Sequence, residues 1–594
     1  MTVRQFIDRP RAVLVVAISV AFVSLMVLIH HVLGNDASDA GVWLVALGQA
    51  EILPYLLWSL VVAILLLWER PKSDPLQIPH SSLTTLNRWS DRPLGTILLG
   101  MVLFLFALFA AADKGWALRL LPPLYHDEYS YLFQAQTFLA GRLSFPEPPA
   151  SEHFEQTHII CDDGIFVSRY FPGTGLWLTP FVAFDQAAIS GWIAQGVIAC
   201  FMGLSIWRAS RVAGLWTGLM IAVSPGLVVF SQTLLSPHPT MVGLAIGWWA
   251  FTRTISTRQI RYAVVAGLAI GFAFLSRPLT AFAIASPWGL FAIREMIRSI
   301  DRRWFYALVL SFVPAIGVLA FHHQMVMGSV WVTPYGHYTD RYTPSHVYGF
   351  FNVTRGHQRA HPDIDAPYDD WSGELDFWQA CLITADRIGT ALPWVGGLFP
   401  IALMVVLGIV AVRVHRDLVL LPILSVIGLV MVYFPYFYVG IMGWSYLVEA
   451  VPFVLLVAAV GVGEVCRSLR SFRLIWTSYA LLFLPFLMME VNWWSTLPPA
   501  FDPNSEIVLP RLQAAERRAK EEELSAGVPS IILYDVDRRS DLHTTWVHND
   551  PALRGSILRG WKLDPRDVEK AFPDRAIYLY QGGFYRLLRG VNQP

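Results

Sequence analysis

Two adjacent carboxylates, Asp127 and Glu128, follow a long apolar run and a Pro-Pro pair in the stretch LPPLYHDEYSYLFQAQTFLAG. A carboxylate in this position could accept a proton as a general base. Adjacent residues of a helix point about 100° apart, so the two groups cannot face each other in one site. One would act while the other supports it or faces elsewhere. Alternatively, Asp127 simply caps the helix that begins there.

Two arginines could bind an anion near these carboxylates. Arg277 in FLSRPLT precedes Pro278 at a helix break, and Arg169 ends the first long polar loop. The guanidinium fork binds phosphate oxygens with two parallel hydrogen bonds, which makes a phosphate the natural partner. Two other interpretations remain, because Arg277 could snorkel to lipid headgroups and Arg169 could be an ordinary loop residue.

Three further polar residues stand near the ends of apolar runs: His238 in LLSPHPT, and Tyr446 with Glu449 in MGWSYLVEAVP. An ionisable residue one turn inside a membrane span is a candidate for a functional site. Glu449 would equally serve as a structural hydrogen-bond partner for a neighbouring helix. A lone histidine such as His238 is more often a satisfied interfacial residue than a ligand.

The elements that position these residues are membrane helices. The 594-residue chain is 55% hydrophobic and 15% charged, with a mean hydropathy of +0.48, which is too apolar for an ordinary soluble protein. Its net charge of zero gives no reason to expect nucleic acid as a partner. Apolar runs long enough to span a bilayer predict about thirteen helices, at residues 12–33, 42–68, 94–112, 186–207, 213–234, 240–255, 262–275, 279–293, 304–321, 394–412, 418–439, 447–465 and 474–491.

Arginines in alternate short loops, such as Arg208 with Arg211 and Arg413 with Arg416, mark the cytoplasmic side. This rule predicts a cytoplasmic N-terminus and a C-terminal region outside the membrane. All the polar candidates then lie on the outer side, as a single site requires. Because arginine far outnumbers lysine, we expect a GC-rich bacterium and place the chain in its inner membrane.

The predicted fold is mainly α, a polytopic helical membrane protein with large outer loops and a small C-terminal α/β domain. In the first outer loop we expect a helix at 127–140, a Pro-rich extended piece, and a helix capped by Thr174. The second outer segment should be an ordered, irregular lid. The last part should contain a charged helix, a buried strand and a hairpin. The predicted units are residues 1–112, 113–180, 181–321, 322–393, 394–491 and 492–594.

The four cysteines form no metal-binding spacing, although Cys161 and Cys381 both fall in outer loops where a disulfide is allowed. The histidines and aspartates of the second outer segment match no known metal site either. The sequence therefore predicts no certain cofactor and leaves a divalent metal open.

Four stretches together resemble the GT-C superfamily of multi-spanning glycosyltransferases, especially its protein O-mannosyltransferase and lipid A aminoarabinose transferase branch. They are YHDEYSYLFQAQTFLAGRL, SRYFPGTGLWLTP, FLSRPLT and GWSYLVEAVPFVLLVAAVG. The resemblance covers roughly residues 122–463. The chain differs from the family in two respects. It has two extra spans before the acidic loop, and Ser445 stands where bacterial relatives usually carry an arginine.

The resemblance implies an inverting transfer of a sugar from a polyprenyl-phosphate donor to a hydroxyl on a lipid, glycan or protein acceptor at the outer membrane face. Asp127 would be the base, with Glu128 in support. Arg169, Arg277 and His238 would contact the donor phosphate, while Tyr446, Glu449 and Thr174 would bind substrate. A transporter or flippase, a polysaccharide polymerase or ligase, and a non-catalytic scaffold are the alternatives.

Overall fold

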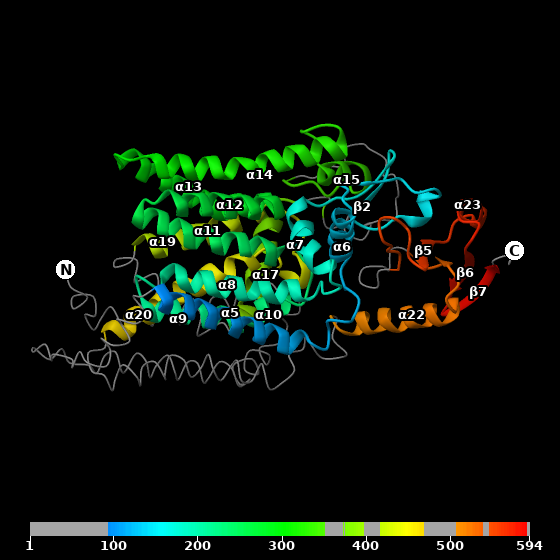
Figure 1. Ribbon diagram of the computed structural model, residues 1–594, viewed down its shortest axis with the longest axis horizontal. Coiled ribbons are helices and arrows are strands. Elements are labelled where there is room, and N and C mark those ends of the chain that lie inside the picture. Colours follow the sequence, from blue (N-terminus) through cyan, green and yellow to red (C-terminus); the bar gives the residue numbers. More distant parts are fainter. Residues whose placement is uncertain are drawn as a thin grey trace, which may run out of the picture.

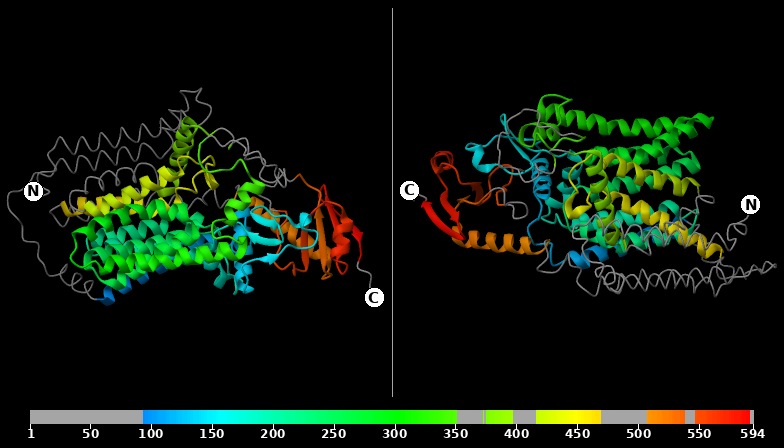
Figure 2. Two further views of the ribbon diagram at one scale, coloured as in Figure 1. Left: turned by 90° about the horizontal axis from the view of Figure 1, so that it is seen from above. Right: turned by 180° about the vertical axis from the view of Figure 1, so that it is seen from behind.

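The computed structural model describes residues 93–350, 372, 375–396, 416–468, 507–537 and 546–590. Over these residues the chain is mainly helical. Helices that run side by side form one elongated body, and a small region of α/β structure lies beyond one end of it (Figure 1). The first outer loop lies between this body and the C-terminal strands (Figure 2).

Among the described residues, four helices are long and apolar enough to cross a membrane. They are α5 (Pro93–Gly115), α8 (Ile189–Ile206), α14 (Arg303–Met327) and α19 (Arg416–Tyr433). Packed with them are α9 (Arg211–Val223), α10 (Pro225–Phe230), α11 (Pro237–Thr257), α12 (Ile260–Ser276), α13 (Pro278–Arg298), α17 (Phe377–Gly396) and α20 (Val451–Ser468). The total of about thirteen spans stays a prediction, because runs 12–33, 42–68 and 474–491, and most of 394–412, lie outside the described residues.

Apolar side chains cover the outer surface of α5 and α14. Phe109 on α5 is 67% exposed and Leu310 on α14 is 68% exposed, and neighbouring Leu, Val and Ile side chains share this orientation. Leaving such a side chain in water instead of burying it costs about 1.5–3 kcal/mol. A continuous surface of this kind is therefore suited to lipid rather than to water.

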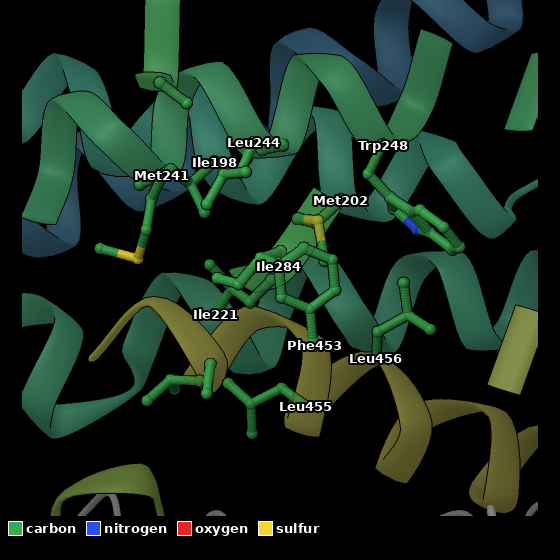
Figure 3. Close-up of a cluster of buried hydrophobic side chains, with 14 of the residues drawn as sticks. Ile198, Met202, Ile221, Met241, Leu244, Trp248, Ile284, Phe453, Leu455 and Leu456 are labelled. Atoms are coloured by element: carbon green, nitrogen blue, oxygen red, sulfur yellow. The ribbon is translucent and has the colours of Figure 1, made fainter. Parts of the chain in front are cut away.

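The interior of the helical body is packed by large side chains between closely spaced helices. Trp248 of α11 and Phe453 of α20, both labelled in Figure 3, pack against Trp288 of α13, with ring centroids 5.1 and 5.8 Å from that of Trp288. Gly267 allows α12 to approach α14, because a Cβ atom there would lie 2.0 Å from Ser311 Oγ. Small residues at such crossings are how membrane helices reach close contact.

Two predicted spans are interrupted at prolines. The run 213–234 is not one helix, because α9 ends at Val223 and α10 starts at Pro225. The run 418–439 ends early, since α19 stops at Tyr433 and Pro435 follows. Proline lacks an N–H and disfavours helical geometry in the residue before it. The expectation of continuous helices was wrong at both places.

The second outer segment is more regular than expected. Its start belongs to α14, which continues to Met327, and it also contains α15 (Pro334–Tyr342) and most of α17. Asp376 and Gln379 form a reciprocal cap before α17, with Gln379 N donating to Asp376 Oδ1 at 2.8 Å. The prediction of an irregular lid was therefore wrong for these residues, and residues 351–371 lie outside the described part.

The first outer loop contains the predicted helix, here α6 (His126–Leu139), and ends in α7 (Pro172–Val182). Between them lie β1 (Phe145–Pro146), the short helix η2 (Ser151–Phe154), β2 (Ile159–Asp162) and β3 (Ile165–Ser168), with the strands in the antiparallel order β1-β3-β2. Cys161 in β2 is a free thiol, as is Cys381, so the disulfide that the sequence allowed is not formed. Burial raises the pKa of the Cys161 thiol.

The C-terminal region is a small α/β unit with the helix, strand and hairpin expected from the sequence. It contains α22 (Leu509–Ser525), β4 (Ser530–Tyr534), β5 (Ile557–Trp561), α23 (Pro565–Ala571), β6 (Ala576–Gln581) and β7 (Phe584–Arg589). The strand order is β5-β4-β6-β7, parallel except for the last pair. Gly582 and Gly583 both have positive φ, which makes the tight turn between β6 and β7.

This unit is fastened to the first outer loop by buried hydrogen bonds. Arg511 of α22 donates to the carbonyls of Pro122 and Leu118 at 2.8 and 3.0 Å. Trp561 Nε1 donates to Glu155 O at 2.9 Å, and the Trp561 carbonyl lies 2.9 Å from His153 Nδ1. The C-terminal unit thus holds the chain that leads into α6.

Replacing Arg511 with Met should lower the free energy of unfolding by about 3 kcal/mol, because buried carbonyls would lose their donor. The unfolding temperature should fall with it. Scanning fluorimetry of the purified protein measures this. Arg566→Met is the matched control, since Arg566 is 77% exposed and pairs only with exposed Asp564. Equal unfolding temperatures for the two variants would contradict the role given to Arg511.

Candidate active site

A cavity of about 390 Å³ opens where the ends of several helices meet the first outer loop. Asp127, Arg169, Arg277 and Tyr446 line it together with segments from α6, α15 and the 433–446 stretch. Four residues predicted from three separate loops are therefore brought to one place. Among the described residues that line it, Asp127 is the only carboxylate.

Asp127 occupies the second position of α6, and Tyr125 is the N-cap, so Asp127 is not the helix cap. Its Oδ1 atom accepts a hydrogen bond from the Tyr170 hydroxyl. Its Oδ2 atom lies 3.7 Å from His158 Nε2. Burial and the Asp127 charge hold the pKa of Tyr170 well above its ordinary value, so Tyr170 stays protonated and keeps donating.

Glu128 points the other way and is buried outside the cavity lining. Its Oε1 accepts from the backbone N–H groups of Leu124 and Tyr125 at 2.9 and 3.0 Å, and its Oε2 accepts from Leu234 N at 2.8 Å. Burial raises the pKa of Glu128, while Arg511 and these three donors act in the opposite direction. The neighbouring carboxylates therefore differ in surroundings. Asp127 faces the cavity, whereas Glu128 links two chain segments by accepting hydrogen bonds from both.

Arg277 is placed by the break between α12 and α13, where Pro278 begins the second helix. Its NH1 lies 2.5 Å from Glu449 Oε1 and its NH2 donates to the Tyr433 hydroxyl at 3.2 Å. Because Arg277 lines the cavity and pairs with fully buried Glu449, it does not snorkel to the bilayer surface. Glu449 reaches the cavity through this arginine.

Arg169, which follows β3, packs against aromatic rings of α15. Its guanidinium carbon is 4.1 Å from the Tyr335 ring centroid and 4.4 Å from that of Tyr338, within cation–π range. Its NH1 lies 3.2 Å from His158 Nδ1. The two predicted arginines thus line one cavity from different parts of the fold: Arg169 follows β3, and Arg277 lies between α12 and α13.

Tyrosine dominates the rest of the lining. Nine tyrosines face the cavity, namely Tyr125, Tyr131, Tyr170, Tyr335, Tyr348, Tyr433, Tyr436, Tyr438 and Tyr446. Three of these belong to the stretch after α19, whose backbone is held by buried Arg387. This side chain donates to the carbonyls of Tyr433, Tyr436, Tyr438 and Val439 at 2.5–3.2 Å.

Besides Glu128 and Glu449, two further predicted residues do not line the cavity. His238 is buried in α11, with Nε2 3.3 Å from Gln195 Oε1. Thr174 lies inside the first turn of α7, whose N-cap is Phe171, so the prediction that Thr174 caps this helix was wrong. Gly173 is the residue that matters for packing there, because a Cβ atom would lie 2.4 Å from Ser276 Oγ.

His158, Tyr170 and Arg387 are site residues that sequence reasoning missed. Tyr170 directly follows Arg169 in SRYFPG, and the tyrosines after α19 appear as the dense aromatic run YFPYFYVG, so both carried a signal. His158 had none, because it reaches Asp127 only through the pairing of β2 with β3.

One group of potential metal ligands lies outside the cavity lining. Donor atoms of Asp162, Asp163 and His337 all fall within 4.8 Å of one another. Arg341 Nε already donates to Asp162 Oδ2 at 3.0 Å. Although burial acts to raise it, His337, Tyr342 and Arg341 hold the pKa of Asp162 below its ordinary value. Arg341 therefore already occupies one carboxylate oxygen of this group.

No protein-family model matches the sequence, and no curated protein matches it. Two solved structures show a distant similarity. They are the apo oligosaccharyltransferase of Archaeoglobus fulgidus, and the archaeal oligosaccharyltransferase AglB of the same organism in complex with an inhibitory peptide and a dolichol-phosphate. Each is 12% identical, with a TM-score of 0.37, over 72% of this chain and 60% of theirs. Similarity at this level assigns neither family nor activity.

Neutralising the two neighbouring carboxylates should affect stability differently: one change should destabilise the protein and the other should not. Glu128→Gln places an amide N–H₂ group against backbone donors, so the free energy of unfolding of this variant should fall by about 1–3 kcal/mol. Asp127→Asn keeps its shape beside the Tyr170 hydroxyl and should unfold at close to the wild-type temperature. Scanning fluorimetry of both variants measures this, and a larger loss for Asp127→Asn would contradict the division of roles.

Proposed function

We propose that the protein is an inverting glycosyltransferase of the GT-C type that moves a sugar from a polyprenyl-phosphate donor to an acceptor hydroxyl at the outer membrane face. The observation that supports the proposal most is the composition of one cavity. Among the described residues that line it, Asp127 is the only carboxylate, and it is accompanied by two arginines, Arg169 and Arg277. One base and a basic cradle are what this reaction needs.

In the proposed reaction Asp127 takes the proton of the acceptor hydroxyl. The acceptor oxygen forms its bond to the anomeric carbon while the bond from that carbon to the phosphate oxygen breaks, and the phosphate leaves with the electron pair. Because attack and departure occur on opposite faces, the configuration inverts. A phosphate leaving group needs cations rather than a proton, unlike the leaving alcohol in glycoside hydrolysis, which requires a second carboxylic acid.

Arg277 and Arg169 supply the positive charge in this proposal. Glu449 and Tyr433 hold Arg277 from one side at 2.5 and 3.2 Å, which fixes the plane of its guanidinium group. A preorganised cation of this kind stabilises developing negative charge without reorganising during the reaction. The aromatic rings around Arg169 limit its movement in a similar way.

The tyrosine-rich lining suits a sugar. Aromatic faces offer apolar surface to the C–H groups of a pyranose ring, and phenolic hydroxyls can donate to or accept from its hydroxyl groups. Arg387 fixes three of these tyrosines through their carbonyls, so the surface is preorganised. The lining thus provides recognition of a polar ring within a mainly apolar wall.

Exposed aromatic side chains support our proposal that the site lies at the membrane surface, where a lipid-linked donor would present its sugar. Exposed aromatic side chains occur near the cavity end of the helical body, at Trp116 after α5, Phe184 after α7 and Trp331 after α14. Aromatic residues concentrate at membrane–water interfaces. We propose a bacterial inner membrane, a cytoplasmic N-terminus, and a lipid, glycan or protein as acceptor.

Asp127→Asn should reduce sugar transfer by at least about 100-fold, because the amide cannot accept the acceptor proton. The assay follows transfer from a panel of radiolabelled polyprenyl-phosphate sugars to lipid and delipidated acceptors by purified protein. Asp163→Asn is the control, since Asp163 is an exposed turn residue outside the cavity. Transfer by Asp127→Asn at the wild-type rate would rule out Asp127 as the base.

Arg277→Lys should raise the KM for the donor about tenfold, because a lysine cannot offer two parallel hydrogen bonds to a phosphate. Initial rates measured over a range of donor concentrations give this value. Arg294→Lys, at an exposed position near the other end of α13, should leave the KM unchanged. An unchanged KM in Arg277→Lys would remove Arg277 from the donor phosphate site.

A further inference from the structure

His158 has a backbone conformation that is unusual for a residue with a side chain. Its φ angle is +66°, in the left-handed region. Three hydrogen bonds hold it there. Its N–H donates to the Tyr338 hydroxyl at 3.0 Å, and its carbonyl accepts from Ser130 Oγ at 2.8 Å and from Arg169 N at 3.1 Å. Such strain persists where surrounding structure overdetermines it, and often at functional sites.

The hydrogen-bond partner of the His158 ring determines where its proton lies. Arg169 NH1 is 3.2 Å from His158 Nδ1, and an arginine can only donate. Nδ1 must therefore accept, which places the proton of the neutral ring on Nε2. An imidazolium would set two donors against each other at this contact. Nε2 is the atom that faces Asp127 Oδ2, at 3.7 Å.

We propose that His158 is a positioning residue for Asp127, with its Nε2–H directed at Oδ2 of the base. This inference rests on the proposed function of Asp127. Each carboxylate oxygen has two lone-pair positions. With Tyr170 on Oδ1 and His158 on one side of Oδ2, the remaining position of Oδ2 is directed to the acceptor hydroxyl. Catalytic contacts often shorten when substrate binds, which brings the 3.7 Å separation into range.

A hydrogen-bond donor stabilises the charged form of a carboxylate, so losing such a donor shifts a carboxyl group toward its neutral form. Only an ionised Asp127 can take the acceptor proton, and His158 keeps its own proton throughout the step. Among the described residues, the other titratable and charged groups around the ring include His126 on α6, Arg169 and Tyr170 after β3, and Tyr338 on α15. None of these supplies a second carboxylate to the ring.

Two amide substitutions separate the contact from the fold. Asn tolerates a left-handed backbone and can still accept from Arg169, but it is too short to reach Asp127. Gln can reach Asp127 with an N–H group. In the pH profile of kcat/KM, His158→Asn should move the acid limb upward by about 0.5–1 unit and lower kcat about tenfold. In His158→Gln, both the acid limb and kcat should lie close to their wild-type values.

Tyr338→Phe is the matched control, because it removes the hydroxyl that accepts from the His158 backbone N–H but leaves both ring nitrogens in place. Its acid limb should coincide with that of the wild type. A His158→Asn profile that also coincides with the wild type would overturn the proposal. So would equal kcat losses in all three variants with no pH shift, since these would indicate a purely structural role.

An activity-independent measurement distinguishes failure of this inference from failure of the proposed function. The infrared band of the Asp127 carboxyl group is the one missing from Asp127→Asn. Its titration midpoint should be higher in His158→Asn than in the wild type, whether or not any sugar is transferred. An unchanged midpoint would overturn the role of His158, whereas a shifted midpoint in a protein that transfers no sugar would overturn only the glycosyltransferase assignment.

Discussion

The buried carboxylate of Glu128 is the interaction on which the site depends. It accepts backbone N–H groups from Leu124 and Tyr125, just before α6, and from Leu234, between α10 and α11. Leaving any of these buried donors without a partner would cost about 1–3 kcal/mol. The start of α6 is therefore fixed against the membrane helices, and Asp127, the residue just before Glu128, is fixed with it.

Ionic groups at this depth are expensive unless they are paired. The structure meets that cost differently at each position. Arg277 is paired with Glu449, Arg387 is surrounded by carbonyl oxygens, and Arg511 faces both carbonyls and Glu128. These arrangements give rigid charged groups around a cavity whose remaining wall is mostly aromatic. Rigidity of this kind is what electrostatic stabilisation of a reaction requires.

Much of this site could be predicted because membrane topology restricts where polar residues can lie. Helix length and arginine bias put Asp127, Arg169, Arg277 and Tyr446 on the outer side, and the structure brings all four to one cavity. Sidedness alone did not separate these residues from His238, which faces Gln195 inside the helical body. Distance from the helix end along the chain does not tell which way a side chain points.

The remaining differences have local causes. Pro225 and Pro435 ended helices that hydropathy treated as continuous, and the Asp376–Gln379 cap started a helix in a segment dense in loop-forming residues. His158 could not be found, because its position depends on a strand register and on a left-handed backbone angle rather than on any local pattern.

The central claim is a single displacement at the anomeric carbon with Asp127 as base. The measurement that tests it most directly is the anomeric configuration of the transferred sugar, determined by NMR on product made from a donor of known configuration. The account predicts inversion. Retention of configuration would require a covalent intermediate or another reaction course and would contradict it.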